Sequence, residues 1–64
     1  MMAHRIPNGY ETKFKGFIEL CETTAEGDVI IIAHPSIIGD TYEELIESLL
    51  RVARAKALLS IGEG

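Results

Sequence analysis

The sequence predicts a small α+β domain in which a small antiparallel β-hairpin or sheet packs against one long amphipathic helix, with oligomerisation completing the core. Two patterns predict it: the continuous apolar run VIIIA, residues 29–33, and the helical periodicity that begins at Thr41. The 64 residues leave room for a single domain, residues 1–64. A domain of this size buries only about 60% of the surface that its unfolded chain exposes. Support from outside the chain's own core is therefore expected.

The first third of the chain is the least decisive part. Residues 1–12 are expected to be an irregular N-terminal segment, because a Pro-Asn-Gly sequence favours a turn. Residues 13–22 fit two structures. A strand would alternate apolar and charged residues between its faces, whereas a helix would gather Phe14 and Phe17 into one stripe. The helix would also hold Gly16 in its interior, at about 1 kcal/mol relative to alanine, so we favour the strand.

The strand at residues 29–33 carries the argument for a partner subunit. A short connection, residues 25–28, precedes it, and its glycine suits a hairpin loop. The run does not alternate as a half-buried strand does, and continuous β-branched residues are typical of a strand covered on both faces. The chain's own helix covers one face. We expect a second subunit to cover the other.

The strongest helical pattern covers residues 41–58. Thr41 and Glu44 have the spacing of a capping box, in which Thr41 accepts a bond from the Glu44 amide and Glu44 reaches back. On a helical wheel the polar residues share one arc, expected to face water, and the apolar residues share the opposite arc. The polar arc holds Glu43, Glu44, Glu47, Ser48, Arg51 and Arg54, and the apolar arc holds Tyr42, Leu45, Ile46, Leu49, Leu50, Val52 and Ala53. That apolar arc is wider than the ~100° needed to pack on one surface, which again indicates another subunit. Residues 58–61 fit either an extension of this helix or a final strand.

Composition narrows the classes of function. A formal net charge of −4 argues against general affinity for nucleic acids. The apolar runs are too short to cross a bilayer and the first residues lack signal-peptide features, so a soluble, cytoplasmic protein without a membrane partner is expected. Cys21 is the only cysteine, which excludes an internal disulfide and fits a reducing cytosol. With His4 and His34 it matches no zinc pattern, so no metal or other cofactor is expected.

The segment HPSIIGDTYEEL, residues 34–45, holds the candidate functional groups. His34, Ser36 and Asp40 lie too close in sequence for the geometry of a catalytic triad, and no nucleophile elbow exposes the serine. No catalytic residues and no enzymatic activity are expected. The segment does lead from the end of a strand to a helix N-terminus, where free amides and the helix dipole favour an anion. The candidate ligand-binding residues are His34, Ser36, Gly39, Asp40 and Thr41.

Two stretches resemble known families. Residues 39–45, GDTYEEL, resemble the G-D-T-x-E-E-A sequence that enters the amphipathic helix of HicB-type antitoxin domains, and the likeness extends over residues 39–55. This resemblance implies a β-β-β-α module that neutralises a small RNase toxin without catalysis of its own. Residues 14–61 are also similar to the scaffold of serine recombinase catalytic domains, without the loop arginines and nucleophilic serine of that family. The second resemblance implies a shared scaffold and not a shared reaction.

The function expected from these observations is a non-enzymatic, homo-oligomeric interaction module. It would bind and neutralise or regulate a macromolecular partner, as an antitoxin or a phage inhibitor does. The alternative is a small-ligand protein that holds an anionic metabolite or nucleotide at the loop 34–41 between subunits. The expected partners are a second copy and another protein. The residues expected at the oligomer interface are Val29, Ile31, Leu45, Leu49 and Val52.

Overall fold

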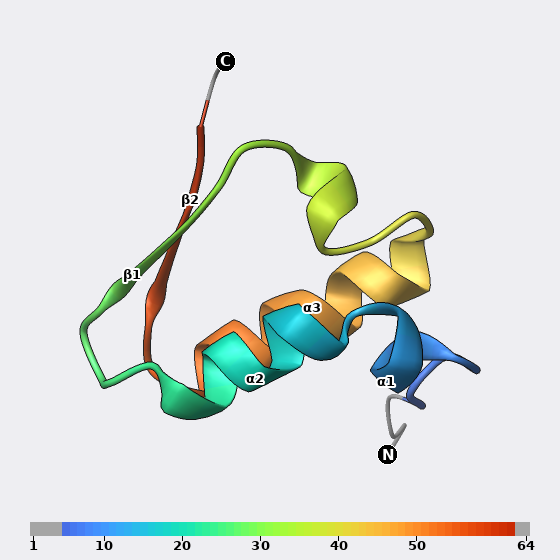
Figure 1. Ribbon diagram of the computed structural model, residues 1–64, viewed down its shortest axis with the longest axis horizontal. Coiled ribbons are helices and arrows are strands. Elements are labelled where there is room, and N and C mark those ends of the chain that lie inside the picture. Colours follow the sequence, from blue (N-terminus) through green and yellow to red (C-terminus); the bar gives the residue numbers. More distant parts are fainter. Residues whose placement is uncertain (1–4, 63–64) are drawn as a thin grey trace.

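Residues 5–62 of the chain are described by the computed structural model (Figure 1). Two helices lead the chain, and a strand, a short 3₁₀ helix, a long helix and a second strand follow. Their bounds are α1 Tyr10–Lys13, α2 Lys15–Thr23, β1 Val29–Ile32, η1 Pro35–Ile37, α3 Tyr42–Arg54 and β2 Leu58–Ile61. α2 lies alongside α3, and the two neighbouring strands share a core with this pair of helices. The chain is therefore a small α+β fold.

The sheet is parallel, so the prediction of an antiparallel hairpin is wrong. β1 pairs with β2 in a register that runs from Val29 with Leu58 to Ile32 with Ile61. η1 and α3 connect the two strands, and a helical crossover of this kind returns the chain to the end where the first strand began. Two strands joined in this way run parallel. β2 also decides between the two structures left open for residues 58–61.

Residues 13–22, for which we favoured a strand, are helical over most of their length. α2 turns Phe17 and Cys21 into the core, and Phe14, which precedes the helix, joins them. Gly16 lies on the open side, with nothing within 4 Å of the place where a Cβ would stand. Burying two phenylalanine side chains contributes several times the ~1 kcal/mol that a glycine costs inside a helix. Residues 15–23 therefore form a helix, and they are not the strand that was predicted to pair with β1.

The irregular N-terminal segment ends earlier than predicted. Residues 5–9 form neither helix nor strand, and residues 1–4 of the predicted segment lie outside the described residues. α1 begins at Tyr10, directly after Gly9, whose φ of 77° is in the left-handed region that favours glycine. Tyr10 is fully buried. The core consists of Tyr10, Phe14, Phe17, Cys21, Ile30, Ile32, Ile38 and Val52.

α3 begins where the sequence predicts and ends about one turn earlier. Thr41 is its N-cap and accepts a hydrogen bond from the Glu44 backbone N–H. At the other end Lys56 has a φ of 57°, and Ala57 donates its N–H to the Val52 carbonyl oxygen across the turn. A left-handed residue with such a bond is a common way for a helix to stop. The chain then enters β2 directly.

One face of β1 is covered by the rest of the described chain and the other is bare. Ile30 and Ile32 point into the core, with 3% and 5% of their surface exposed. Val29 and Ile31 point outward, with 53% and 73% exposed. Parallel sheets in proteins are normally covered on both faces. Residues 5–62 leave the outer face of β1 uncovered, and the second cover for this strand stays a prediction.

Candidate interaction surfaces

His34 and Ser36 are bonded to each other in the loop between β1 and α3. Ser36 donates its backbone N–H to His34 Nδ1 at 3.2 Å, and Ser36 Oγ lies 3.0 Å from the same nitrogen. The imidazole thus caps η1 in the manner of a helix N-cap. Both residues are exposed. Local capping accounts for their arrangement without a ligand.

The other three predicted ligand residues, Gly39, Asp40 and Thr41, lie at the N-terminus of α3. A carboxylate of the chain itself accepts a backbone N–H there, as an anion was predicted to do. Glu44 Oε1 accepts the Asp40 N–H at 2.8 Å, and Thr41 Oγ1 accepts the Glu44 N–H at 3.2 Å. Lys13 Nζ lies 2.7 Å from Asp40 Oδ2 and 3.2 Å from Glu44 Oε2. Gly39 packs against the first turn of the helix. None of the three hollows described below is lined by a predicted ligand residue.

Glu44 and Lys13 stabilise each other's charged forms. The Asp40 N–H that donates to Glu44 holds the pKa of this carboxyl below its ordinary value of 4.5 in spite of burial, and Lys13 lowers it further. The Asp40 carboxylate, and after it Glu44, raise the pKa of Lys13 above 10.5. Both groups are therefore charged at neutral pH. The contact ties the end of α1 to the start of α3.

Acid is therefore expected to destabilise the fold through Glu44. A carboxyl whose pKa is lowered by folding contributes stability that is present above its unfolded pKa and is lost as the pH falls through its folded pKa. We expect the urea midpoint of the wild type to fall more steeply below pH 4.5 than that of Glu44→Gln. Glu43→Gln, on the exposed side of the same turn, is the matched control. Equal pH profiles for wild type and Glu44→Gln, measured by circular dichroism, would contradict this assignment.

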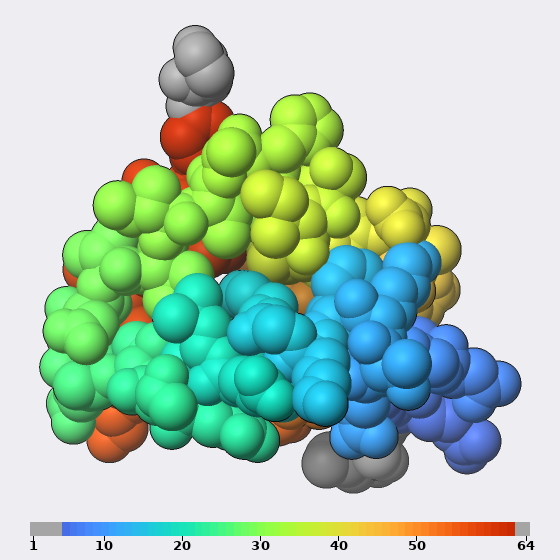
Figure 2. All heavy atoms as spheres, in the orientation of Figure 1, coloured from blue at the N-terminus to red at the C-terminus, as the bar shows by residue number. Residues whose placement is uncertain are grey.

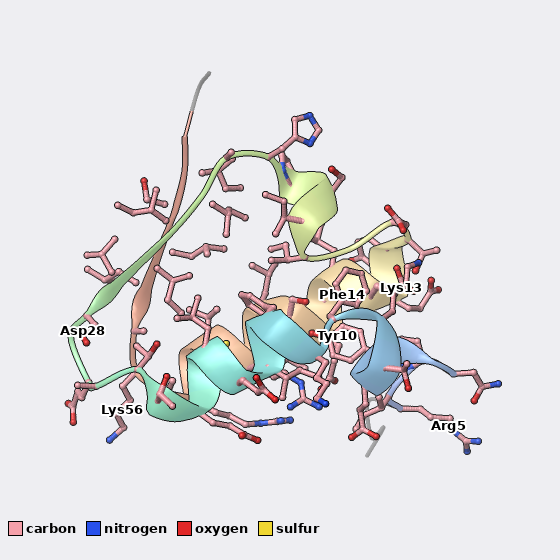
Figure 3. All side chains as sticks on the ribbon, viewed as in Figure 1. Arg5, Tyr10, Lys13, Phe14, Asp28 and Lys56 are labelled. Atoms are coloured by element: carbon pink, nitrogen blue, oxygen red, sulfur yellow. The ribbon has the colours of Figure 1, made fainter. Side chains whose placement is uncertain are left out.

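A cluster of polar side chains is buried between α3 and the N-terminal helices (Figure 3). Ser48 Oγ donates to the Ile38 carbonyl oxygen at 2.5 Å and lies 2.6 Å from Tyr10 Oη, which therefore donates to it. Arg51 Nε lies 2.9 Å from Glu47 Oε2, and the guanidinium carbon lies 5.3 Å from the centre of the Tyr10 ring. Glu47 and Ser48 are only 1% and 0% exposed. Part of the arc predicted to face water is thus inside the molecule.

The inward turn of this arc leaves apolar residues of α3 on the outside. We define the α3 stripe as Tyr42, Ile46, Leu49, Leu50 and Ala53. Tyr42 is 73% exposed and Leu49 is 41% exposed. Ala53 is exposed as well, while Ile46 and Leu50 are partly buried. An amphipathic helix on the surface of a globular protein normally turns its apolar stripe inward. The α3 stripe is therefore a first candidate interaction surface.

A second apolar surface lies on the outer face of the sheet and beside it. We define the sheet patch as Leu20, Val29, Ile31, Ile37 and Leu58, which are between 46% and 73% exposed. Val29 and Ile31 share one face of β1, and Leu58 pairs with Val29. If a fully exposed aliphatic residue presents about 180 Å², the patch amounts to roughly 500 Å², near the top of the ~300–600 Å² found for the largest patch of a monomer. The largest apolar patch of a monomer is often functional, so the sheet patch is a second candidate interaction surface.

A hollow of about 330 Å³ adjoins the sheet patch between α2, β1 and η1. Figure 2 shows this face, with β1 and η1 in green above the teal α2. The exposed residues Leu20, Ile31 and Ile37 line the hollow, and Phe14 and Phe17 lie at its base. Part of the sheet patch, at Leu20, Ile31 and Ile37, thus borders an open groove beside the strand.

Comparison with known proteins assigns no relative. No protein-family model matches the chain. No curated protein and no solved structure shows significant similarity to it either. The element order, two helices followed by β1, η1, α3 and β2, also differs from the β-β-β-α order that the antitoxin resemblance implies. The proposed function therefore rests on the geometry of the α3 stripe and the sheet patch.

The residues predicted at an oligomer interface divide between the two surfaces and the core. Val29 and Ile31 belong to the sheet patch, and Leu49 belongs to the α3 stripe. Leu45 is partly buried against the core, and Val52 is a core residue with 5% of its surface exposed. The place of these residues in an oligomer interface stays a prediction.

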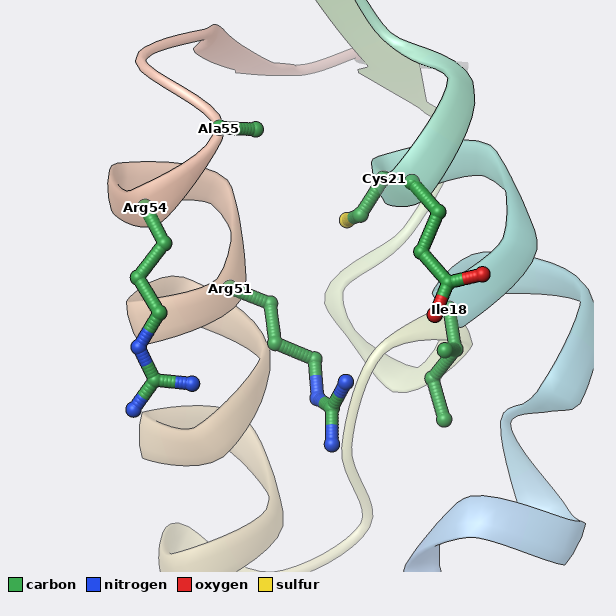
Figure 4. A pocket seen from close by; sticks show the side chains of 6 residues that line it. Ile18, Cys21, Arg51, Arg54 and Ala55 are labelled. Carbon is green, nitrogen blue, oxygen red and sulfur yellow. The ribbon is translucent and has the colours of Figure 1, made fainter.

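Cys21 lines a further hollow, of about 210 Å³, between α2 and the end of α3 (Figure 4). Arg51 and Arg54 border it from α3, and Glu22 borders it from α2. Burial raises the pKa of the Cys21 thiol, and Arg51 offsets this only in part. The thiol is therefore protonated at neutral pH, which is the form with the lower reactivity.

Two further findings concern metals and membranes. Among residues 5–62, no group of three or more histidine, cysteine, aspartate or glutamate side chains is placed to hold a metal ion. Within the same residues, no helix combines the length and the apolar character needed to span a bilayer. The α3 stripe and the sheet patch are therefore the two candidate interaction surfaces.

Proposed function

We propose that the protein is a non-enzymatic interaction module, working as a homo-oligomer in the cytoplasm, that binds an extended segment of another protein at the sheet patch. Binding there would neutralise or regulate the partner. The observation that carries the proposal is that residues 5–62 leave one edge and the outer face of β1 uncovered, next to an apolar groove. The side chains of Ser36, Ser48 and Glu44 make their hydrogen bonds to groups of the chain itself.

The backbone of β1 offers hydrogen bonds on the side of the groove. Leu58 donates its N–H to the Asp28 carbonyl oxygen, and Gly62 donates to Ile32. In a parallel pair, alternate residues direct both backbone groups toward the neighbouring strand. Ile30 and its alternates therefore face β2, and the N–H and C=O groups of Val29 and Ile31 point to the free edge. An unpaired edge is a template for a further strand.

An extended polypeptide fits this combination better than a small ligand does. Strand addition supplies affinity through backbone hydrogen bonds and specificity through pockets for alternate side chains. Here the groove beside Ile31 is lined by Leu20 and Ile37, so it suits apolar side chains at every second position of the partner. The expected partner is therefore an extended segment with an apolar side chain at every second position.

Selection of displayed random peptides against the immobilised full chain tests this function. We expect enrichment of peptides with alternating apolar residues, and binding at least about tenfold weaker to Ile31→Asp, since burying an aliphatic side chain is worth ~1.5–3 kcal/mol. Ile31 is 73% exposed, so the substitution leaves the core intact. Leu49→Asp, on the α3 stripe, is the matched control and is expected to bind as the wild type does. No enriched peptide, or equal binding to Ile31→Asp, would refute the proposal.

A further inference from the structure

The orientation of α3 is unusual enough to need an explanation. Glu44, Glu47 and Ser48 point into the chain, where Lys13, Arg51 and Tyr10 contact them. The apolar residues on the opposite side of the helix face outward. Burying charges while exposing aliphatic side chains is unfavourable for a monomer. The arrangement becomes reasonable if another surface covers the α3 stripe.

The α3 stripe has the spacing of a helix-pairing seam. Tyr42, Ile46, Leu49 and Ala53 follow one another at intervals of four, three and four residues, which keeps them in a line along the helix. Leu50 widens this line on one side. Beyond Leu50, on the same side, the helical period places Glu43 near the start of the helix and Arg54 at its end.

Glu43 and Arg54 are available for contacts with another molecule. Both are exposed, and neither has an ion-pair partner in the described part of the chain. Arg5 lines a shallow hollow with Glu43 without pairing with it. The stripe is therefore bordered by an acidic residue at one end and a basic residue at the other. A surface of this kind is complementary to itself after a half turn.

We propose that α3 packs against α3 of a second copy, antiparallel, across a two-fold axis near the middle of the stripe. This deepens the proposed function by naming the surface on which two copies associate. The half turn places Glu43 of each copy beside Arg54 of the other, with Ile46 opposite Leu49 and Leu50. It also sets the two helix dipoles antiparallel, so that each helix N-terminus lies beside the C-terminus of the other helix. In a parallel two-fold pair, Glu43 and Arg54 of the two copies would lie on opposite sides of the seam and would not meet. A two-fold interface uses the same surface on both copies.

The size of the stripe sets the strength of this dimer. With Tyr42 and Leu49 as its main exposed residues, each copy would bury on the order of 400 Å², compared with ~800 Å² per partner in a standard interface. Because this interface is smaller than a standard one, we expect a weak, reversible dimer with a Kd on the order of 10–100 µM. The charges add little affinity, because exposed ion pairs are worth ~0.2–1 kcal/mol. Their effect is to select the antiparallel orientation.

Sedimentation velocity of the full chain, from about 5 µM to about 500 µM, tests the proposal. We expect the wild type to pass from monomer to dimer across this range and Leu49→Asp to stay monomeric. Glu43→Arg and Arg54→Glu are each expected to weaken the dimer roughly fivefold. The double variant Glu43→Arg, Arg54→Glu restores the opposite charges, and we expect its Kd to return to within about twofold of the wild type. Far-ultraviolet circular dichroism checks that each variant is folded.

The outcomes separate this proposal from the proposed function. A wild type that is monomeric at every concentration, or a Leu49→Asp variant that dimerises normally, would overturn the α3 pairing. A double variant weaker than both single variants would show that the two charges do not meet, and would overturn the antiparallel geometry. If Ile31→Asp abolishes the dimer while Leu49→Asp does not, the copies associate through the sheet patch instead. Peptide binding at the sheet patch is measured independently, so its loss leaves the dimer result intact.

Discussion

Tyr10→Ala is expected to remove a large part of the chain's stability at 25 °C. Tyr10 is fully buried, its ring centre lies 5.0 Å from that of Phe14, and the Arg51 guanidinium lies over its other side. Removing a buried aromatic ring typically costs ~3–5 kcal/mol. At 0.05–0.15 kcal/mol per residue, a chain of this length has a total stability of roughly 3–10 kcal/mol. A urea titration followed by circular dichroism would show a midpoint far below that of the wild type.

Tyr10→Phe separates the ring from its hydroxyl. The ring and its contact with Arg51 remain, while the hydrogen bond to Ser48 is lost. Ser48 still donates to the Ile38 carbonyl oxygen, so no buried donor is left without an acceptor. We expect a loss of about 1 kcal/mol. A Tyr10→Ala protein as stable as the wild type would mean that α1 is not part of the core.

The long helix could be predicted from the sequence because its signals are local. The Thr41 cap, the charge order and the period of the apolar residues all lie within α3 itself, and the helix begins at Tyr42 as expected. The hairpin could not be excluded in the same way. Residues 13–22 carry enough charged residues at alternate positions to imitate a strand, and the choice depended on whether Phe14 and Phe17 would find a core. Once that segment is helical, β1 has only residues 58–61 to pair with, and the connection through α3 makes the pair parallel.

The local sequence pattern could not predict which side of α3 packs against the rest of the chain. Periodicity shows that a helix has two unlike sides, but it does not say which side meets the rest of the chain. Here that choice depends on partners more than thirty residues away: Tyr10 for Ser48, and Lys13 for Glu44. The arrangement of the candidate ligand loop also depends on distant residues. Its amides and carboxylates are already bonded within the α3 N-terminus and to Lys13, which no reading of residues 34–41 alone could reveal.

Gly39→Ala and Gly16→Ala are expected to change stability in opposite directions. At Gly39 an added Cβ would stand 2.6 Å from the Leu45 backbone nitrogen and 2.8 Å from its Cα. These atoms belong to the first turn of α3 and cannot move aside singly, so the loop must shift and carry the fully buried Ile38 with it. We expect a loss of roughly 2–3 kcal/mol. At Gly16, in the first turn of α2, an added Cβ meets nothing within 4 Å, and alanine is the better helix former by up to about 1 kcal/mol.

The two variants therefore test two features. Gly39→Ala tests the close approach of the loop to the N-terminus of α3, and Gly16→Ala tests whether residues 15–23 are a helix. Urea midpoints give both values under the same conditions, with each variant as the control for the other. If Gly16→Ala lowers the midpoint, residues 15–23 are not a helix, and the strand that the sequence favoured regains its support. If Gly39→Ala leaves the midpoint unchanged, the loop does not approach the helix N-terminus closely. The Asp40 N–H would then not be held on Glu44, and the anion site at residues 34–41 would become available again, because it is this close approach that fills the helix N-terminus with the chain's own carboxylates.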